Sequence, residues 1–193
     1  MEIYKYVTQD RVDVLSRKRI RFTPPPFFND PFEASPVLNF DIEPEEWLRI
    51  GEVERERQGL PQEFVDRVSD PEQMARHMPT VLDCMVGMFQ GMAGVLSLTE
   101  RPDNLVMWAH YADQHRGFVI GFDSKHPWFE ASDAFRVNVL AKVRYANDRP
   151  SKGLKTLTLE DTYLTKSLDW SYEEEWRMFR FLGLADQCID TGN

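Results

Sequence analysis

The second half of the sequence alternates short apolar segments, typical of strands, with segments of helical spacing, an order that few folds accommodate. The expected strands are 94–99, 118–122, 137–145 and 176–182, and the expected helices are 103–115 and one from Thr158 to about Trp170. Thr158 and Asp161 have the spacing of a capping box, and Gly117 suits the end of the earlier helix. Because the helices differ in length, the pattern predicts an α+β fold with mixed or antiparallel sheets.

The N-terminal segment predicts a strand over 3–7, a helix that begins after Thr8, and a second extended segment over 20–23. The basic run of residues 16–22 suits the C-terminal end of that helix better than a nucleic-acid patch. Pro24–Pro26 then exclude regular strand pairing, so FFNDPFE is expected in a loop.

The charge of the chain is concentrated in one segment. The 193 residues carry a net charge of −9, and eleven acidic and four basic side chains give residues 41–73 a charge of −7. Prolines at 44, 61 and 71 indicate two or three short surface helices, followed by a more apolar helix over 80–90. We therefore predict a single domain over residues 1–193 with an acidic helical insert at about 41–92. Since the remainder is nearly neutral, an anionic ligand is electrostatically admissible.

Several classes of protein are excluded or disfavoured. Apolar runs are too short for a membrane span, and MEIYKYVTQD lacks the features of a secretory signal, so the expected localisation is cytoplasmic. Cys84 and Cys188 have no metal-binding spacing, and Cys84 is expected in the core. The motifs GxSxG, GxxxxGK[ST], GxGxxG and HExxH are absent, which removes the usual sequence grounds for common hydrolase, P-loop, Rossmann and zincin assignments.

Two acidic residues stand at the start of the last expected strand. In SYEEEWR, strand alternation places Glu173 and Glu175 on one face, with Arg177 continuing the row. Paired carboxylates there can stabilise a developing positive charge or hold a sugar hydroxyl. The alternative is a solvated acidic turn, which this segment alone favours.

The loop FFNDPFE offers a second group of polar side chains. Asn29, Asp30 and Glu33 carry oxygen atoms that suit Mg²⁺ as ligands. The sequence Asn-Asp-Pro is also common in turns, and a structural turn is the favoured interpretation. The neighbouring aromatics, Phe28 among them, can form a wall for a planar ring.

Two histidines lie near the end of the expected helix 103–115. His110 and His115 are five residues apart, so on a helix they diverge and do not chelate one ion. Zinc is disfavoured and we predict no metal. Tyr111 and His110 are equally compatible with packing and with a site, whereas His115 suits the helix C-terminus.

Four motifs occur in order along the chain: IYKY, FTPPPFFNDPFE, LSLTERPDNLVMWAHYADQHRGFVIGFD and KSLDWSYEEEWR. In this order they resemble the bacterial family catalogued as domain of unknown function 2971. That resemblance spans nearly the whole chain and implies little about function.

The order of elements also resembles ADP-ribosyltransferases. The matching series is Lys5 on the first strand, Ser97 and Thr99 in LSLT, the helix ending in HRG before FVIGFD, and Glu173 and Glu175. Lys5 stands where that family prefers Arg or His, and LSLT lacks the full S-T-S motif.

This second resemblance implies cleavage of NAD by ADP-ribosyl transfer or glycohydrolysis, with NAD as substrate and an unknown protein or nucleic-acid acceptor. Glu175 would stabilise the ribosyl cation and Glu173 would activate the acceptor. The implied NAD-contacting residues are Lys5, Tyr6, Phe28, Asn29, Ser97, His110 and Tyr111. Such an enzyme would suit a defence or toxin-type effector restrained by a regulatory protein. A metal-dependent nuclease or hydrolase and a non-catalytic sensor or interaction module, for example in phage defence, remain the alternatives.

Overall fold

The computed structural model describes residues 1–130 and 140–184, and its 44% helix and 24% strand confirm the predicted α+β class. The main sheet has five antiparallel strands in the order β4-β1-β3-β9-β5. Their bounds are β1 Glu2–Val7, β3 Ala93–Thr99, β4 Phe118–Asp123, β5 Ala141–Lys142 and β9 Glu175–Phe181. The helices are α1 Asp13–Arg17, α2 Pro44–Gln58, α3 Gln62–Val68, α4 Pro71–Met92, α5 Leu105–Tyr111, α6 Pro127–Glu130 and α7 Leu159–Tyr163.

Shorter elements complete the described part of the chain. Two small parallel sheets pair β2 Val37–Asn39 with β7 Ser151–Gly153, and β6 Arg144–Ala146 with β8 Thr165–Ser167. The 3-10 helices are η1 Gln9–Arg11, η2 Pro25–Phe27, η3 Leu168–Glu173 and η4 Leu182–Leu184. The second small sheet and η3 lead directly into β9, so they fix where that strand begins.

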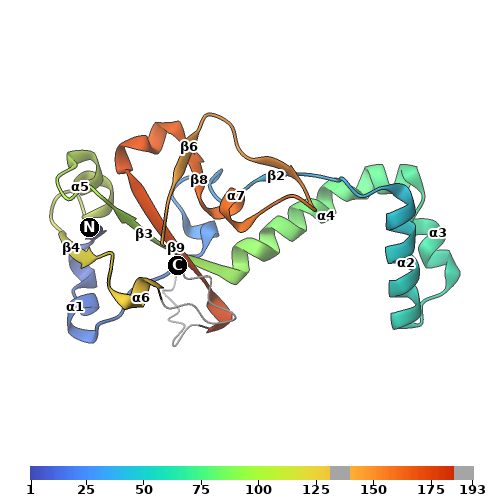
Figure 1. Cartoon of the computed structure of the whole chain (residues 1–193), viewed down its shortest axis with the longest axis horizontal. Coiled ribbons are helices and arrows are strands. Elements are labelled where there is room, and N and C mark those ends of the chain that lie inside the picture. The colour runs from blue at the N-terminus through green and yellow to red at the C-terminus, as the bar shows by residue number, and fades with distance from the viewer. Residues whose placement is uncertain (131–139, 185–193) are drawn as a thin grey trace.

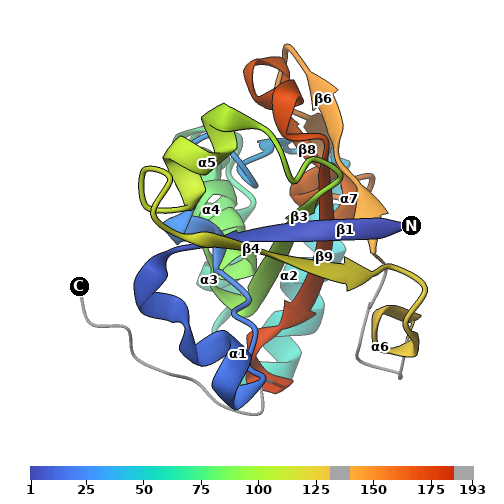
Figure 2. The ribbon, with the colours of Figure 1, turned by 90° about the vertical axis from the view of Figure 1, so that its left-hand side faces the viewer.

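The main sheet is strongly twisted, and β1 with β4 crosses in front of β3 and β9 (Figure 2). Between β1 and β3 the paired residues are Tyr4 and Thr99, whereas β3 and β9 pair along their whole length. This arrangement leaves β1 beside the same end of β3 at which β9 begins.

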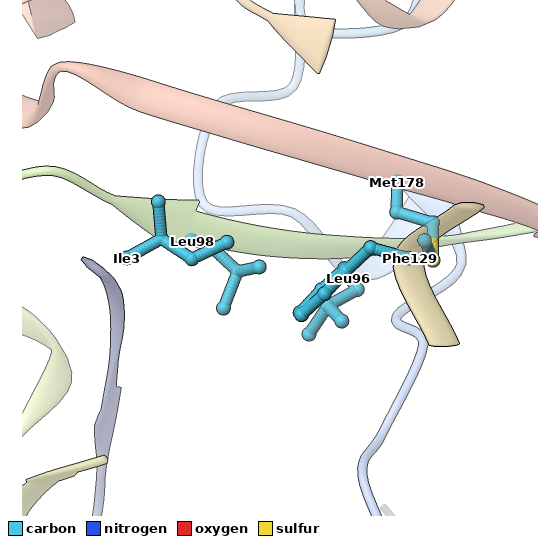
Figure 3. Packing of buried hydrophobic residues seen from close by; sticks show 5 residues of the cluster. All are labelled: Ile3, Leu96, Leu98, Phe129 and Met178. Carbon is cyan, nitrogen blue, oxygen red and sulfur yellow. The ribbon is translucent and has the colours of Figure 1, made fainter. Parts of the chain in front are cut away.

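The two faces of the sheet pack different layers. On one face, Ile3, Leu96, Leu98 and Met178 pack against Phe129 from α6 (Figure 3). The opposite face, again of β3 and β9, buries a second apolar cluster with α7, made of Ala34, Ala93, Val95, Tyr163 and Phe179. Ser97 and Thr99 of β3 and Glu175 and Arg177 of β9 lie on this second face, next to the apolar cluster.

The acidic segment folds as a helical arm. Helix α4 runs from the sheet to α2 and α3, which lie at its far end (Figure 1). As predicted, α2 and α4 begin at prolines, and Pro61 precedes α3. Helix α4 is longer than expected, because Asp70 caps its start and Pro79 lies within it without ending it.

Two expected elements, the helix over 103–115 and the extended segment over 20–23, form only in part. The helix predicted over 103–115 ends at Tyr111, because residues 113–115 adopt positive φ angles and return the chain towards β4. Gly117 permits this return, since a Cβ there would lie 2.1 Å from the carbonyl oxygen of Val7. The extended segment over 20–23 pairs with the sheet at Thr23 by an isolated bridge to Val95.

The helix predicted from Thr158 to about Trp170 and the strand predicted over 137–145 are both interrupted. The capping box is present, but α7 ends at Tyr163, because the following residues pair with β6 as β8. That pairing also splits the expected strand into β5 and β6, and residues 137–139 lie outside the described residues.

Two expectations concern single residues and membranes. Cys84 is exposed on α4, so its predicted burial is wrong, and Cys188 lies outside the described residues. Across residues 1–130 and 140–184, no helix combines the length and apolar character needed to cross a membrane.

Candidate functional site

The site is built on the second face of the sheet, where β3 and β9 are paired. Their register places Glu175 opposite Thr99 and Arg177 opposite Ser97, so these side chains share one face. Just before β9, Glu174 takes a left-handed backbone conformation with φ 45°. Glu173 therefore belongs to η3 and not to the strand, yet its carboxylate also turns towards the interior.

A buried ion cluster occupies this position. Its members come from four separate segments and are all less than 9% exposed: Glu33, Lys166, Glu173, Glu175 and Arg177. Three carboxylates therefore face two cations in a region with almost no solvent. The alternative of a solvated acidic turn is wrong for Glu173 and Glu175, which are 2% and 3% exposed.

Arg177 fixes one side of the cluster. Its Nε lies 2.8 Å from Oε1 of Glu175, and its Nη2 lies 2.9 Å from Oε2 of the same carboxylate. Nη1 donates to the carbonyl oxygen of Tyr163 at 2.8 Å, and Nη2 also contacts Glu33. This bidentate grip, typical of arginine, holds Glu175 in one orientation.

Lys166 fixes the other side. Its Nζ lies 2.6 Å from Oε2 of Glu173, 3.0 Å from Oε2 of Glu175 and 3.6 Å from Oε2 of Glu33. Burial lowers the pKa of Lys166, but the charges of Glu175 and Glu173 outweigh burial and raise it above its ordinary value. Lys166 is therefore charged at neutral pH and holds the two catalytic candidates together.

Lys5 and Ser97 lie near Glu175 on the neighbouring strands. The Nζ of Lys5 donates to the carbonyl oxygen of Ser97 at 3.1 Å, and the Ser97 side chain acts to lower the pKa of Glu175. Burial lowers the pKa of Lys5 to about 8, against the opposing charge of Glu175. Burial raises the pKa of Glu175. The positive charge of Lys166 acts to lower that pKa, and the negative charge of Glu173 acts to raise it further. The predicted residues Lys5, Ser97 and Glu175 thus meet in space.

Tyr111 and Asn29 approach the second carboxylate. The Tyr111 hydroxyl donates to Oε1 of Glu173 at 2.6 Å, and the Asn29 side chain acts to lower the pKa of Tyr111. Burial and the charge of Glu173 raise the pKa of Tyr111 well above its ordinary value. Both predicted residues therefore belong to the periphery of the buried ion cluster.

An aromatic rim, defined by His110, Trp170 and Tyr172, lies beside Glu173 and Lys166. The Trp170 ring centroid is 6.3 Å from that of His110 and 6.1 Å from that of Tyr172, and the Tyr172 hydroxyl is 3.4 Å from Nδ1 of His110. The Lys166 ammonium lies 5.0 Å from the centre of the Trp170 ring. Because Trp170 and Tyr172 are half-buried and His110 is exposed, the rim connects the cluster with solvent.

Two predicted NAD-contacting residues have structural partners instead. The Tyr6 hydroxyl donates to the carbonyl oxygen of Arg101 at 2.8 Å, and its ring packs edge-on against Trp108. Phe28 lies under the guanidinium of Arg177, 5.5 Å from ring centre to Cζ, and packs against the apolar cluster. Phe28 thus touches the buried ion cluster through Arg177, whereas the partners of Tyr6 lie outside the cluster.

The oxygen donors of the FFNDPFE loop are used for structure. Oδ1 of Asp30 accepts the backbone N–H of Phe32 at 2.9 Å, as expected for a turn, and Glu33 belongs to the buried ion cluster. Within residues 1–130 and 140–184 no group of three or more His, Cys, Asp or Glu side chains is arranged to hold a metal ion. His115 follows α5 in a left-handed conformation, so it is not a helix C-terminal residue.

A hollow at the surface is lined by two members of the buried ion cluster. Lys166 and Glu33 line it, together with Asp30, Asp148, Asp161 and Arg149. The Lys166 side chain therefore borders both the aromatic rim and this hollow. Glu173 and Glu175 do not line it.

Two further site residues were missed by the sequence analysis. Tyr145 accepts the backbone N–H of Glu175 at 2.9 Å, and burial raises the pKa of Tyr145 to about 12. Lys166 is the more important omission. A lone lysine within YLTKSL, close to three consecutive glutamates, could have indicated a buried ion pair.

Comparisons with known proteins bear on the region from α5 to β9. Residues 107–178 match the model of a family described as Protein of unknown function (DUF2971). This match supports the predicted resemblance to the family over residues 107–178, and the motifs before residue 107 lie outside it. The DUF2971 match includes Tyr111, Lys166, Glu173, Glu175 and Arg177. No curated protein and no solved structure matches the chain, and the resemblance to ADP-ribosyltransferases stays a prediction.

Proposed function

We propose that this protein is an NAD-dependent ADP-ribosyltransferase-like enzyme, which transfers ADP-ribose to an acceptor or to water. The observation that supports the proposal is that Glu173 and Glu175 share the ammonium of Lys166, while Tyr111 donates to Glu173 and Lys5 donates to the carbonyl oxygen of Ser97 on the neighbouring strand. These residues come from β1, β3, α5, β8, η3 and β9. Lys5, Ser97, Glu173 and Glu175 were chosen from the order of motifs, whereas Tyr6, also predicted to contact NAD, has its partners outside this group.

The charges of the group suit the proposed reaction. When the bond between nicotinamide and ribose breaks, its electron pair leaves with the nicotinamide nitrogen, and positive charge develops on the ribose. The buried ion cluster holds three carboxylates, and those of Glu173 and Glu175 bring negative charge close to the aromatic rim. In a region with little solvent this charge stabilises the ribosyl cation more strongly than it would in water.

Each carboxylate has a different role in the proposal. Glu175, held by Arg177, binds a ribose hydroxyl and faces the developing cation. Glu173 takes the proton from the acceptor hydroxyl or water as its oxygen attacks the ribose carbon. Lys5 contacts a phosphate or the ribose. No step in this sequence requires a metal ion.

The test is release of nicotinamide from NAD, measured by chromatography. We expect the wild-type protein to release nicotinamide and Glu175→Gln to lower the rate by about 100-fold, because the amide cannot stabilise the cation. Glu174→Gln is the matched control, since Glu174 is adjacent in sequence but pairs with Arg101 near the surface. Its rate should stay within about twofold of wild type.

A second variant guards against loss of folding in Glu175→Gln. Tyr111→Phe removes the hydroxyl that binds Glu173 without changing the shape of the ring, and we expect it to lower the rate by about tenfold. Circular dichroism checks the fold of each variant. Absence of nicotinamide release by the wild type, or an unchanged rate in folded Glu175→Gln, would exclude this function.

The second candidate is a non-catalytic sensor or interaction module. It is favoured by the saturation of Glu175, both of whose oxygens are bound by Arg177 or Lys166 in a buried position. In that case the cluster serves stability alone, and none of the three variants changes NAD turnover. An effector role in phage defence, with a regulatory protein partner, is compatible with either candidate.

A further inference from the structure

The ammonium of Lys166 occupies an unusual position for a lysine side chain. It contacts three carboxylates and lies 5.0 Å from the centre of the Trp170 ring, although the residue is only 7% exposed. Aromatic faces combined with acidic groups are the usual protein environment for organic cations. The protein therefore contains a cation-binding environment that one of its own side chains fills.

The aromatic rim gives this environment a planar shape and an opening. Trp170 and Tyr172 are tilted by 38° with ring centres 6.1 Å apart, and His110 lies 6.3 Å from Trp170 with its Nδ1 3.4 Å from the Tyr172 hydroxyl. The backbone of Tyr172 is also fixed, because the Asn104 side chain donates to its carbonyl oxygen at 2.9 Å. The rim is thus positioned by α5 and η3 and remains partly open to solvent.

Lys166 has a second place available for its ammonium. The hollow that borders its side chain is also lined by Asp30, Asp148 and Asp161. A lysine side chain has several rotatable bonds, so its ammonium can move between the two acidic surroundings without a change of backbone. Displacement would leave Glu173 beside the aromatic rim without its resident cation, whereas Glu175 would keep Arg177.

We propose that the aromatic rim and Glu173 bind a planar, positively charged aromatic ring, which displaces the ammonium of Lys166 into the hollow. The inference rests on the proposed function, in which this ring is the nicotinamide of oxidised NAD. It adds that the ring is selected by its charge and that Lys166 is a positioning residue that competes with it.

The first experiment compares two ligands of almost equal shape. Binding of 1-methylnicotinamide, a cation, and of nicotinamide, which is neutral, is measured by tryptophan fluorescence and calorimetry on the full chain. We expect the cation to bind at least about tenfold more tightly, because cation–π and carboxylate interactions require its charge. Equal affinities, or binding of neither compound, would overturn the inference.

The second experiment removes the competitor. Lys166→Met keeps the length of the side chain without its charge, and we expect 1-methylnicotinamide to bind this variant at least about threefold more tightly than wild type. Lys142→Met is the matched control, because Lys142 also lies over a tryptophan ring, Trp176 at 5.9 Å, and pairs with Glu100 at the surface. Its affinity should equal that of wild type.

Trp170→Leu keeps the inference testable if Lys166→Met does not fold. We expect this half-buried substitution to weaken binding of the cation by about tenfold and to leave the weak binding of nicotinamide nearly unchanged. Unchanged cation affinity in folded Trp170→Leu or in folded Lys166→Met contradicts the inference.

The outcomes separate this inference from the proposed function. Selective binding of 1-methylnicotinamide without NAD cleavage would support the cation site and exclude the enzyme. NAD cleavage combined with equal binding of the two ligands would support the enzyme and exclude selection by charge.

Discussion

At the scale of single residues, the buried ion cluster decides both stability and chemistry. Burying five charged groups is costly, and the cost is offset only while each charge keeps its partners. Arg177 satisfies this condition with hydrogen bonds to Glu175, Glu33 and the carbonyl oxygen of Tyr163. Lys166 satisfies it with hydrogen bonds to Glu173 and Glu175 and with its position over the Trp170 ring.

Replacing Arg177 should therefore destabilise the protein strongly. Arg177→Met leaves Glu33 and Glu175 buried with a single shared cation, Lys166, and we expect a loss of about 3–5 kcal/mol in the free energy of unfolding. Arg101→Met is the control, because Arg101 pairs with Asp103 and Glu174 at the surface. That change should lower the free energy of unfolding, measured by urea denaturation, by less than about 1 kcal/mol. Equal costs for the two variants would mean that the buried ion cluster contributes little to folding.

At the scale of elements, local signals were predicted well and long-range pairings were not. The strands β1, β3, β4 and β9 follow directly from apolar patterns, and prolines correctly indicate the starts of α2 and α4. The end of α7 at Tyr163 depends on pairing of β8 with β6, two segments about twenty residues apart. No local pattern in TYLTKSLDW encodes that contact, so the sequence favoured a longer helix.

The same distinction applies to the candidate site. Glu173, Glu175, Ser97 and Tyr111 were selected because short motifs contain them, and strand register then brings Ser97 and Glu175 to one face. Lys166 was missed because its contacts depend on η3, which turns the chain so that Glu173 and Glu175 come to lie beside β8. Side-chain burial is a property of the assembled fold, which also explains why Cys84, in an apolar run, proved to be exposed.

The capping box of α7 offers a test at this scale. The Thr158 hydroxyl accepts the backbone N–H of Asp161, and the Asp161 carboxylate accepts the backbone N–H of Thr158. Thr158→Ala removes one of these bonds, and we expect a loss of about 1 kcal/mol in thermal unfolding. Thr8→Ala is the control, because Thr8 precedes η1 without a side-chain capping bond and should cost less than about 0.5 kcal/mol. A larger effect of Thr8→Ala would contradict this account of the two caps.

At the scale of the whole molecule, the acidic charge and the candidate site are kept apart. Residues 41–73 carry −7 of the net charge of −9, and they fold as α2, α3 and the start of α4 at the far end of the arm (Figure 1). The sheet that carries the buried ion cluster is thus nearly neutral. An anionic substrate such as NAD meets little long-range repulsion there, which the total charge alone would not indicate.

The arm and the sheet should also differ in local stability. In β3, six of the seven residues are buried and its backbone is paired on both sides, with β1 and β9. Among the described side chains of α2 and α3, only Gly51 and Val65 are buried, and these helices pack mainly on each other. Few buried contacts permit opening without unfolding of the sheet.

Hydrogen exchange followed by mass spectrometry measures this difference directly. We expect amides of α2 and α3 to exchange at least about 100-fold faster than those of β3, because their opening leaves the core intact. A synthetic peptide of residues 42–70 provides the reference for exchange without tertiary contacts, and the arm should show protection between that of the peptide and that of β3. Protection of the arm equal to that of β3 would instead mean that arm and sheet unfold as one cooperative unit, so that the buried ion cluster depends on the helices of the arm.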